Sequence, residues 1–409
     1  MLTWLAKFAR IEPEPTIVYI YHIDHEHDRT YAENLAEYLQ GAGAACVSIQ
    51  LRADGLRPEL ALCLHDRPGV VVGFNATLDH SWLPSGSFLE AAERTGTPVL
   101  QWILDHPSAR WPEFYASTAS NCRYLLNTEE ECRYFETYCV PGALTAPMGG
   151  VGPNRRSRVA RLAENEFHRR RFACIIPLSL HRVRSMAENR AAMDALDAPL
   201  ADAAREAIER AKFDLAGPLD GHVQAALAAR GGVVPAGVFN ALCHIVEQSV
   251  QEFRRLKIFS VARNHPVLVQ SDESAVPLVA GAKAFMEADV GMQYTWARVP
   301  TCRAVLSVSP PGGMIHDRTL NALNAGCVAI LEDGPAGRGI FEHGKNALLF
   351  RYDDDSIEEC LRIVCEQPDR AYEIARAGMK LRDDPRLRFG RFHNLLELAR
   401  RGAPARAAS

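Results

Sequence analysis

Two glycines, an arginine and a threonine lie close together between residues 305 and 350, where the surrounding pattern predicts the start of a helix. Residues 305–308 form a short apolar run, which predicts a buried strand. A Pro-Pro-Gly-Gly segment follows at 310–313, and residues 316–319 then open a helical pattern with Asp317 as the expected N-cap and Gly326 at its end. Residues 327–331 return as a second strand. This order predicts a βαβ unit of a parallel sheet.

The chemistry that such a unit suits is the binding of a diphosphate. The first turn of a helix presents unpaired backbone N–H groups and the positive end of the helix dipole. Gly312 and Gly313 would let the backbone approach an anion, while Arg318 and Thr319 would add a charge and a hydroxyl. The alternative is that the glycines only form a turn and that Arg318 is solvated.

A second group of reactive side chains follows the predicted strands of the first third of the chain. Residues 22–28 read His-Ile-Asp-His-Glu-His-Asp after a predicted strand, and Asp105 follows another. Because parallel sheets hold ligands at the carboxyl ends of their strands, Asp24, His25 and Asp105 are candidates for a base that takes a proton from a bound hydroxyl. Residues 22–28 could also bind a metal by composition. Consecutive ligands cannot easily point at one ion, so we expect a solvated or substrate-facing loop and no metal site.

The elements that would position these groups alternate between strands and helices. Strands are expected at 16–21, 45–51, 69–74, 98–104 and 123–127, and helices at 31–40, 58–65, 88–95 and 129–138. This alternation predicts a Rossmann-like, open parallel sheet. The second part of the chain predicts strands at 172–177 and 267–270, helices over 154–171 and 276–288, and a helix-rich stretch at 182–256.

Two further side chains could contact a bound nucleotide. Tyr294, in the segment 291–296, could stack on a base, as could Trp296, although the more common role of an aromatic in such a place is in the core. Arg338 lies in the loop 332–339 that follows the second strand of the βαβ unit, and it could add positive charge, as could Lys345.

Composition narrows the class of protein. The 409 residues, 47% of them hydrophobic, suit two domains with a core each. The formal net charge of -4 gives no basic excess for nucleic acid, and the sequence has no apolar run long enough for a transmembrane helix. The 11 cysteines form no C-x-x-C pair and lie mostly in apolar runs, so we expect reduced thiols in a cytoplasmic protein.

The last third of the chain resembles the donor-binding half of the GT-B glycosyltransferases, and most closely their CgeB-like branch. His316, Arg318 and Gly326 match the family's helix pattern. The segment 341–350, Phe-Glu-His-Gly-Lys-Asn-Ala-Leu-Leu-Phe, matches its next motif, and residues 353–356 match the acidic start of another helix. Related retaining enzymes carry glutamates where this chain has Gly313 and Asn321, so the contact to the donor ribose and the stereochemical outcome are left open.

The resemblance implies an α/β fold of two Rossmann-like domains that face each other across a cleft, with a helix-rich stretch in the second. The expected parts are an acceptor domain over 1–152, a nucleotide-sugar domain over 153–388, and a C-terminal helix and tail over 389–409 that returns to the first domain. The implied reaction is metal-independent transfer of a hexose-type sugar from a nucleotide-diphosphate sugar, without another cofactor, to an unknown glycan, protein or small molecule. The alternatives are an inactive nucleotide-sugar-binding or assembly protein and a sugar-nucleotide epimerase. The residues expected to hold the donor are Gly312, Gly313, His316, Asp317, Arg318, Thr319, Asn321, Arg338 and Tyr294.

Overall fold

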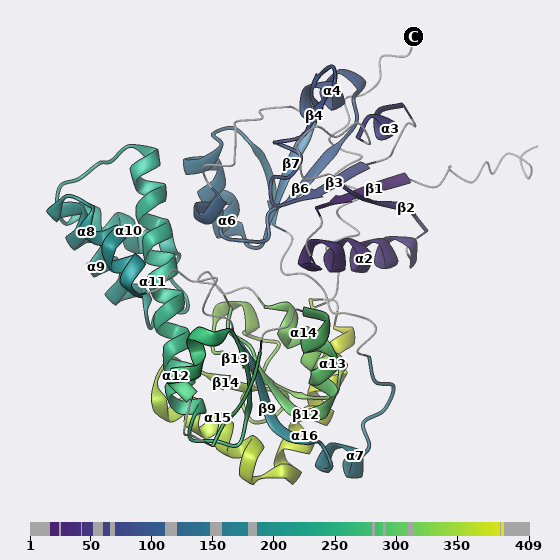
Figure 1. The fold of residues 1–409 in the computed structure, drawn as a ribbon, viewed down its shortest axis with the longest axis vertical. Coiled ribbons are helices and arrows are strands. Elements are labelled where there is room, and N and C mark those ends of the chain that lie inside the picture. The colour runs from purple at the N-terminus through teal and green to yellow at the C-terminus, as the bar shows by residue number, and fades with distance from the viewer. Residues whose placement is uncertain are drawn as a thin grey trace, which may run out of the picture. The chain divides into compact units, whose positions relative to one another are not determined.

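The chain forms two compact units in the computed structural model (Figure 1). The structure describes residues 17–23, 26–41, 43–51, 60–65, 70–110, 121–147, 158–178, 186–279, 283–288, 292–309, 315–384 and 386–387. The first unit comprises the described residues of 17–103 and 121–125, and the second those of 104–110 and 126–387. The domain borders predicted near residues 152 and 388 lie outside the described residues and stay predictions.

A six-stranded sheet organises the first part of the chain. Its order is β2-β1-β3-β6-β7-β8, and the neighbouring pairs from β2 to β7 are parallel. The predicted strands of this region are confirmed to within two residues at each end. Continuous apolar runs such as Val70–Phe74 are typical of strands buried on both faces, whereas β2 at the edge of the sheet is mostly exposed. The strands are β1 (Ile17–His22), β2 (Ala45–Gln50), β3 (Val70–Phe74), β6 (Val99–Trp102), β7 (Cys122–Leu126) and β8 (Leu144–Pro147).

Helices alternate with these strands along the chain. They are α2 (Glu26–Gly41), α3 (Leu60–His65), α4 (Phe88–Thr95), α5 (Pro107–Arg110) and α6 (Glu129–Tyr134), which continues as a π-helix, η2 (Phe135–Cys139). A small antiparallel pair, β4 (Trp82–Leu83) and β5 (Gly86–Ser87), precedes α4.

A second six-stranded parallel sheet forms the centre of the second unit. Its order is β11-β10-β9-β12-β13-β14. In chain order this is 3-2-1-4-5-6, the order of a dinucleotide-binding Rossmann fold. The strands are β9 (Phe172–Pro177), β10 (Leu268–Ser271), β11 (Phe285–Ala288), β12 (Cys302–Leu306), β13 (Val328–Glu332) and β14 (Leu348–Phe350).

Two helix predictions were wrong in part. Of the helix expected at 276–288, the described residues are helical only at Val276–Val279 (α12), and Phe285–Ala288 form β11 instead. Pairing with β10 decides this segment, since tertiary context readily outweighs a weak local preference for helix. Of the helix expected over 154–171, the described residues from 158 onward are helical only at Glu164–His168 (α7).

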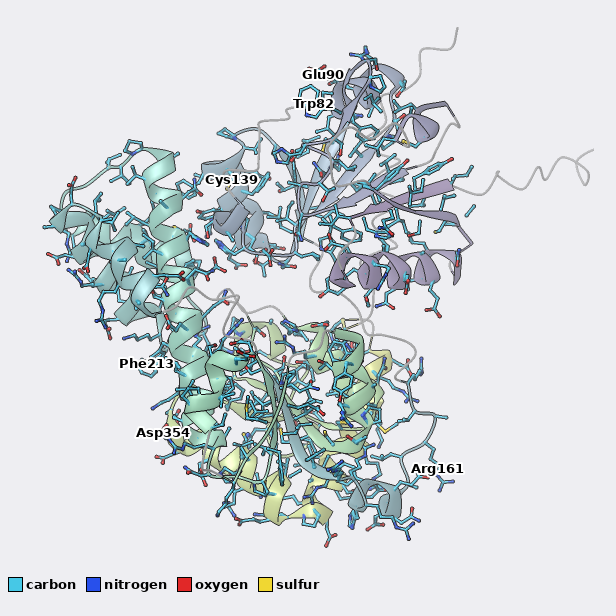
Figure 2. The ribbon with its side chains drawn as sticks, in the orientation of Figure 1. Trp82, Glu90, Cys139, Arg161, Phe213 and Asp354 are labelled. Atoms are coloured by element: carbon cyan, nitrogen blue, oxygen red, sulfur yellow. The ribbon has the colours of Figure 1, made fainter. Side chains whose placement is uncertain are left out.

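One long helix, α11 (Ala236–Ala262), ties the helix-rich stretch to the second sheet, as Figure 1 shows. Leu242 and Val246 pack into a core shared with α9 (Ala198–Ala211) and α10 (Leu219–Ala228), while Ile258 and Phe259 belong to the core of the sheet. Nζ of Lys257 forms an ion pair with Oδ1 of Asp354 at 2.9 Å. Asp354, labelled in Figure 2, begins α15 (Asp354–Glu366). The predicted helix-rich stretch is confirmed and also contains α8 (Met186–Asp194).

Three more helices come between or after the strands of the second sheet in chain order. They are α13 (Met292–Arg298), α14 (Asp317–Asn324) and α16 (Pro368–Gly378). Among the described residues, no helix is both long and apolar enough to cross a membrane. The final helix predicted at 389–401 lies outside the described residues.

Candidate functional site

The topological switch point of the second sheet lies between β9 and β12. Open parallel sheets bind ligands beside such a point, outside the carboxyl ends of the strands. β12 ends at Leu306 and leads to α14, which begins at Asp317 and returns the chain to β13. The predicted βαβ unit is therefore confirmed, and the N-terminus of α14 follows the strand at the switch point.

His316, rather than Asp317, is the N-cap of α14. Its backbone is extended, with φ -69° and ψ 149°, and its Nδ1 atom lies 3.3 Å from the backbone nitrogen of Arg318, which can donate to it. The N-cap prediction at Asp317 was wrong by one residue, because the histidine ring takes the capping role that an aspartate more often fills. Gly326, with φ 63° after the C-cap residue Ala325, confirms the predicted end of the helix.

His316 and Asp317 form a contact pair at the first turn of α14. Nδ1 of His316 also contacts Oδ1 of Asp317, and one ring nitrogen can donate to this carboxylate or accept from the Arg318 N–H, but not both. Burial acts to raise the pKa of Asp317, but the charge and hydrogen bond of His316, with Arg318, outweigh it and lower this pKa. Ionised Asp317 stabilises the start of the helix, where a negative charge meets the positive end of the helix dipole.

The other predicted residues of this helix differ in their access to solvent. Thr319 and Asn321 are 1% and 2% exposed, whereas Arg318 is half-buried. Nδ2 of Asn321 donates to the carbonyl of Asp317 at 3.0 Å, which fastens the first turn. Arg318 is thus the better placed of the three for a ligand that arrives from solvent, and the donor contacts of Thr319 and Asn321 stay predictions.

Tyr294 has one face of its ring next to a cation. The guanidinium of Arg298 lies 4.9 Å from the ring centre, and the Tyr294 hydroxyl donates to Glu287 at 2.9 Å. A nucleobase could therefore stack only on the other face of the ring. Trp296, at 6% exposed, is a buried residue. Arg338 follows a short 3-10 helix, η6 (Pro335–Gly337), and is exposed, so its predicted contact with a donor stays a prediction.

Among the candidate bases, the structure describes only Asp105. It is exposed and follows β6. Burial raises the pKa of Glu131 and of Glu247 to about 8, and the negative charge of Asp105 adds to both shifts. Ser108, in α5 just after Asp105, donates to Glu247 of α11 at 3.2 Å. The sequence analysis named Asp105 but missed Glu247, because Glu247 is 139 residues away from its partner Ser108 along the chain.

Asp24, His25, Gly312 and Gly313 lie outside the described residues, so their predicted roles stay predictions. Within the described residues, Glu164, His168 and Asp369 are close enough together to share a metal ion. All three are exposed, and exposed acidic groups commonly lie together without an ion, so we assign no metal site to them.

Glu332 is a buried carboxylate that the sequence analysis did not single out. It ends β13 at 9% exposed, on the carboxyl edge of the sheet. Its Oε1 atom accepts hydrogen bonds from the backbone N–H of Ser309, at 2.8 Å, and from the hydroxyl of Tyr352, at 2.5 Å. An acidic residue directly after the apolar run 327–331 was the available signal.

Residues 275–394 match the family model described as glycosyl transferase-like. This glycosyl transferase-like region includes β12, α14 and β13, and so both the helix start and Glu332. A search of curated proteins finds no match.

Solved structures share the fold over most of the chain. HepE of Anabaena, in complex with UDP and glucose, is 9% identical with a TM-score of 0.52, over 94% of this chain and 100% of that chain. Sucrose-phosphate synthase from Thermosynechococcus elongatus is 8% identical with a TM-score of 0.51, over 94% and 100%. The DNA modifying enzyme β-glucosyltransferase, solved with and without uridine diphosphoglucose, is 7% identical with a TM-score of 0.50, over 94% and 99%. This likeness confirms the predicted α/β fold of the GT-B class, while the CgeB-like branch stays a prediction.

Proposed function

We propose that this chain is a glycosyltransferase that takes a sugar from a uridine diphosphate sugar. The observation that carries the proposal is the start of α14, where His316 and Arg318 lie at a helix N-terminus after the switch-point strand, inside the glycosyl transferase-like region. HepE was solved with UDP and glucose, and the β-glucosyltransferase with uridine diphosphoglucose. A hexose such as glucose on UDP is therefore the first donor to test.

The α14 start suits the departure of a diphosphate. As the bond between the anomeric carbon and the diphosphate oxygen breaks, that oxygen gains negative charge. Backbone N–H groups of the first turn and the Arg318 guanidinium would stabilise this charge without a metal ion. Within the aspartate run 353–355, Asp353 caps α15 by accepting from the Ser356 N–H at 2.8 Å.

The acceptor is proposed only as a molecule with a nucleophilic hydroxyl. Its oxygen bonds to the anomeric carbon and its proton must pass to a base within hydrogen-bond reach, if the reaction inverts. Asp24, His25 and Asp105 are the candidates, and Asp105 is exposed at the end of β6. We propose no contact for the acceptor beyond these groups.

A thermal-shift panel of nucleotide sugars, each with EDTA and with magnesium, tests the proposal. We expect UDP and UDP-glucose to stabilise the protein equally in both conditions, because a bound ligand raises the melting temperature by mass action. We also expect UDP to be released from UDP-glucose during incubation. Tight binding without release of UDP would favour an inactive binding protein, and release of free sugar in an altered configuration would favour an epimerase. No stabilisation by any nucleotide would contradict the proposal.

A further inference from the structure

We propose that Glu332 is a positioning residue for the proposed donor site and that Tyr352 and Arg254 hold it in place. The inference rests on the proposed function, because the backbone that Glu332 fixes leads from β12 toward α14. All of the contacts involved lie within the second unit.

The carboxylate of Glu332 extends the attachment of the chain beyond the end of β12. The last backbone bond between β12 and β13 in this place is the one from the Ser307 N–H to the carbonyl of Ile330, at 2.8 Å. Two residues later, the N–H of Ser309 donates to Oε1 of Glu332, at 2.8 Å. This side-chain acceptor therefore holds Ser309 at the edge of the sheet. The chain therefore leaves for α14 from a fixed point.

Tyr352 fixes the same carboxylate oxygen from the segment after β14. It follows β14, is 1% exposed, and its hydroxyl donates to Oε1 of Glu332 at 2.5 Å. Burial raises the pKa of Tyr352 well above its ordinary value, and the charge of Glu332 raises it further. The hydroxyl therefore stays protonated and donates throughout the physiological range, so Oε1 lies between two permanent donors.

Arg254 of α11 supports Tyr352. Its guanidinium lies 4.7 Å from the centre of the Tyr352 ring, and it is 3% exposed. It also donates to the carbonyls of Ala211, at 3.1 Å, and Asp214, at 3.0 Å, at the end of α9. A buried cation beside this ring offsets part of the cost of burying the Glu332 carboxylate. The contacts thus form a continuous series from the end of α9 to Ser309.

The physical consequence is preorganisation. A binding site whose supporting backbone is fixed before the ligand arrives loses less conformational entropy on binding. Loosening Ser309 should therefore weaken donor binding by more than it lowers the stability of the whole protein. This expectation separates a positioning role from a purely structural one.

Three variants and a control, titrated with UDP, test the proposal. Tyr352→Phe removes one donor, and we expect the Kd for UDP to rise about fivefold, the effect of one ordinary hydrogen bond. Glu332→Gln keeps an oxygen that can accept from both donors, so its Kd should stay within about twofold of the wild type, whereas Glu332→Leu should raise the Kd more than about tenfold. Tyr372→Phe is the matched control. Tyr372 lies on α16, and its hydroxyl donates to the carbonyl of Leu162 at 3.5 Å, so the substitution removes a comparable hydroxyl that does not contact Glu332. It should leave the Kd unchanged.

The proposal is overturned if folded Tyr352→Phe and Glu332→Leu bind UDP as the wild type does, or if Glu332→Gln is as weak as Glu332→Leu. A wild type that binds no uridine nucleotide would instead refute the proposed function. Residue-level hydrogen exchange then still tests the positioning role of Glu332. Glu332→Leu must speed exchange of the Ser309 amide, and Glu332→Gln must not. Equal exchange rates of the Ser309 amide in the wild type, Glu332→Leu and Glu332→Gln would refute the positioning role, whatever the outcome for the proposed function.

Discussion

The guanidinium of Arg170 donates a 2.9 Å hydrogen bond to the carbonyl of Gly326, 156 residues further along the chain. It also donates to the carbonyls of Ala325 and Cys302, each at 2.9 Å. The first two carbonyls lie at the C-terminus of α14, and the third begins β12. One cation therefore satisfies the helix end and fastens it to the strand that precedes the helix, which sets the frame of the βαβ unit.

Replacing this cation should destabilise the second unit. We expect Arg170→Ala to lower the free energy of unfolding by about 1.5–3 kcal/mol, the range for hydrogen bonds to a charged group. Urea unfolding measures the effect, and Arg169→Ala, which removes an exposed neighbour, is the control with an expected change below about 0.5 kcal/mol. Equal effects of the two substitutions would show that the bonds of Arg170 add nothing to stability.

The turn after β3 carries backbone strain. Asn75 and Ala76 have φ of 48° and 58°, and the Thr77 N–H donates to the carbonyl of Phe74 at 2.9 Å across them. Alanine in this left-handed region costs roughly 1 kcal/mol more than glycine. Ala76→Gly should therefore keep or raise the free energy of unfolding, whereas Ala36→Gly within α2 should lower it by about 1 kcal/mol. A similar loss in both variants would argue against strain at Ala76.

The sequence predicted the elements with strong local signals and missed those decided by distant contacts. Apolar runs such as residues 172–177 gave their strand directly, and the left-handed Gly326 ended α14 as expected. Residues 285–288 gave the wrong element because their pairing partner, β10, decides them. Glu332 was missed for the same reason, since its partners Ser309 and Tyr352 come from different loops. Periodicity reports which face is buried but not which distant group a buried polar atom meets.

Asp79 should make stability depend on pH. Burial raises its pKa to about 7, although Gln101 Nε2, at 2.6 Å, and the Tyr124 hydroxyl, at 3.1 Å, donate to it and oppose the shift. Because the folded pKa exceeds the unfolded value of about 4, the folded state holds a proton that the unfolded state has lost between about pH 4 and pH 7. The contribution of Asp79 to stability therefore falls as the pH rises through this window.

Comparison with Asp79→Asn isolates this effect, because the amide does not titrate. We expect the variant to gain about 2 kcal/mol relative to the wild type between about pH 5 and pH 8. Urea unfolding at several pH values measures the difference, with Asp202→Asn, on the exposed side of α9, as the control. A difference between Asp79→Asn and the wild type that stays constant with pH would refute the raised pKa.

The base of the proposed reaction can be sought among three side chains. We expect at least one of Asp24→Asn, His25→Ala and Asp105→Asn to lower turnover of UDP-glucose by about 100-fold or more while the affinity for UDP stays the same. Such a loss is typical of a group that moves a proton in the transition state without holding the donor. If all three variants turn over at the parent rate, the base lies elsewhere or the mechanism needs none.

The most direct test of the account is a calorimetric titration of UDP into wild type, Arg318→Ala and Arg362→Ala. Arg318 lies on the first turn of α14, whereas Arg362 is an exposed residue of α15 and serves as the charge-matched control. We predict that Arg318→Ala weakens binding by about 2 kcal/mol, or about 30-fold, as expected for a lost charge-assisted contact to phosphate, and that Arg362→Ala binds as the wild type does. Equal affinity of all three proteins for UDP would contradict a donor site at the start of α14.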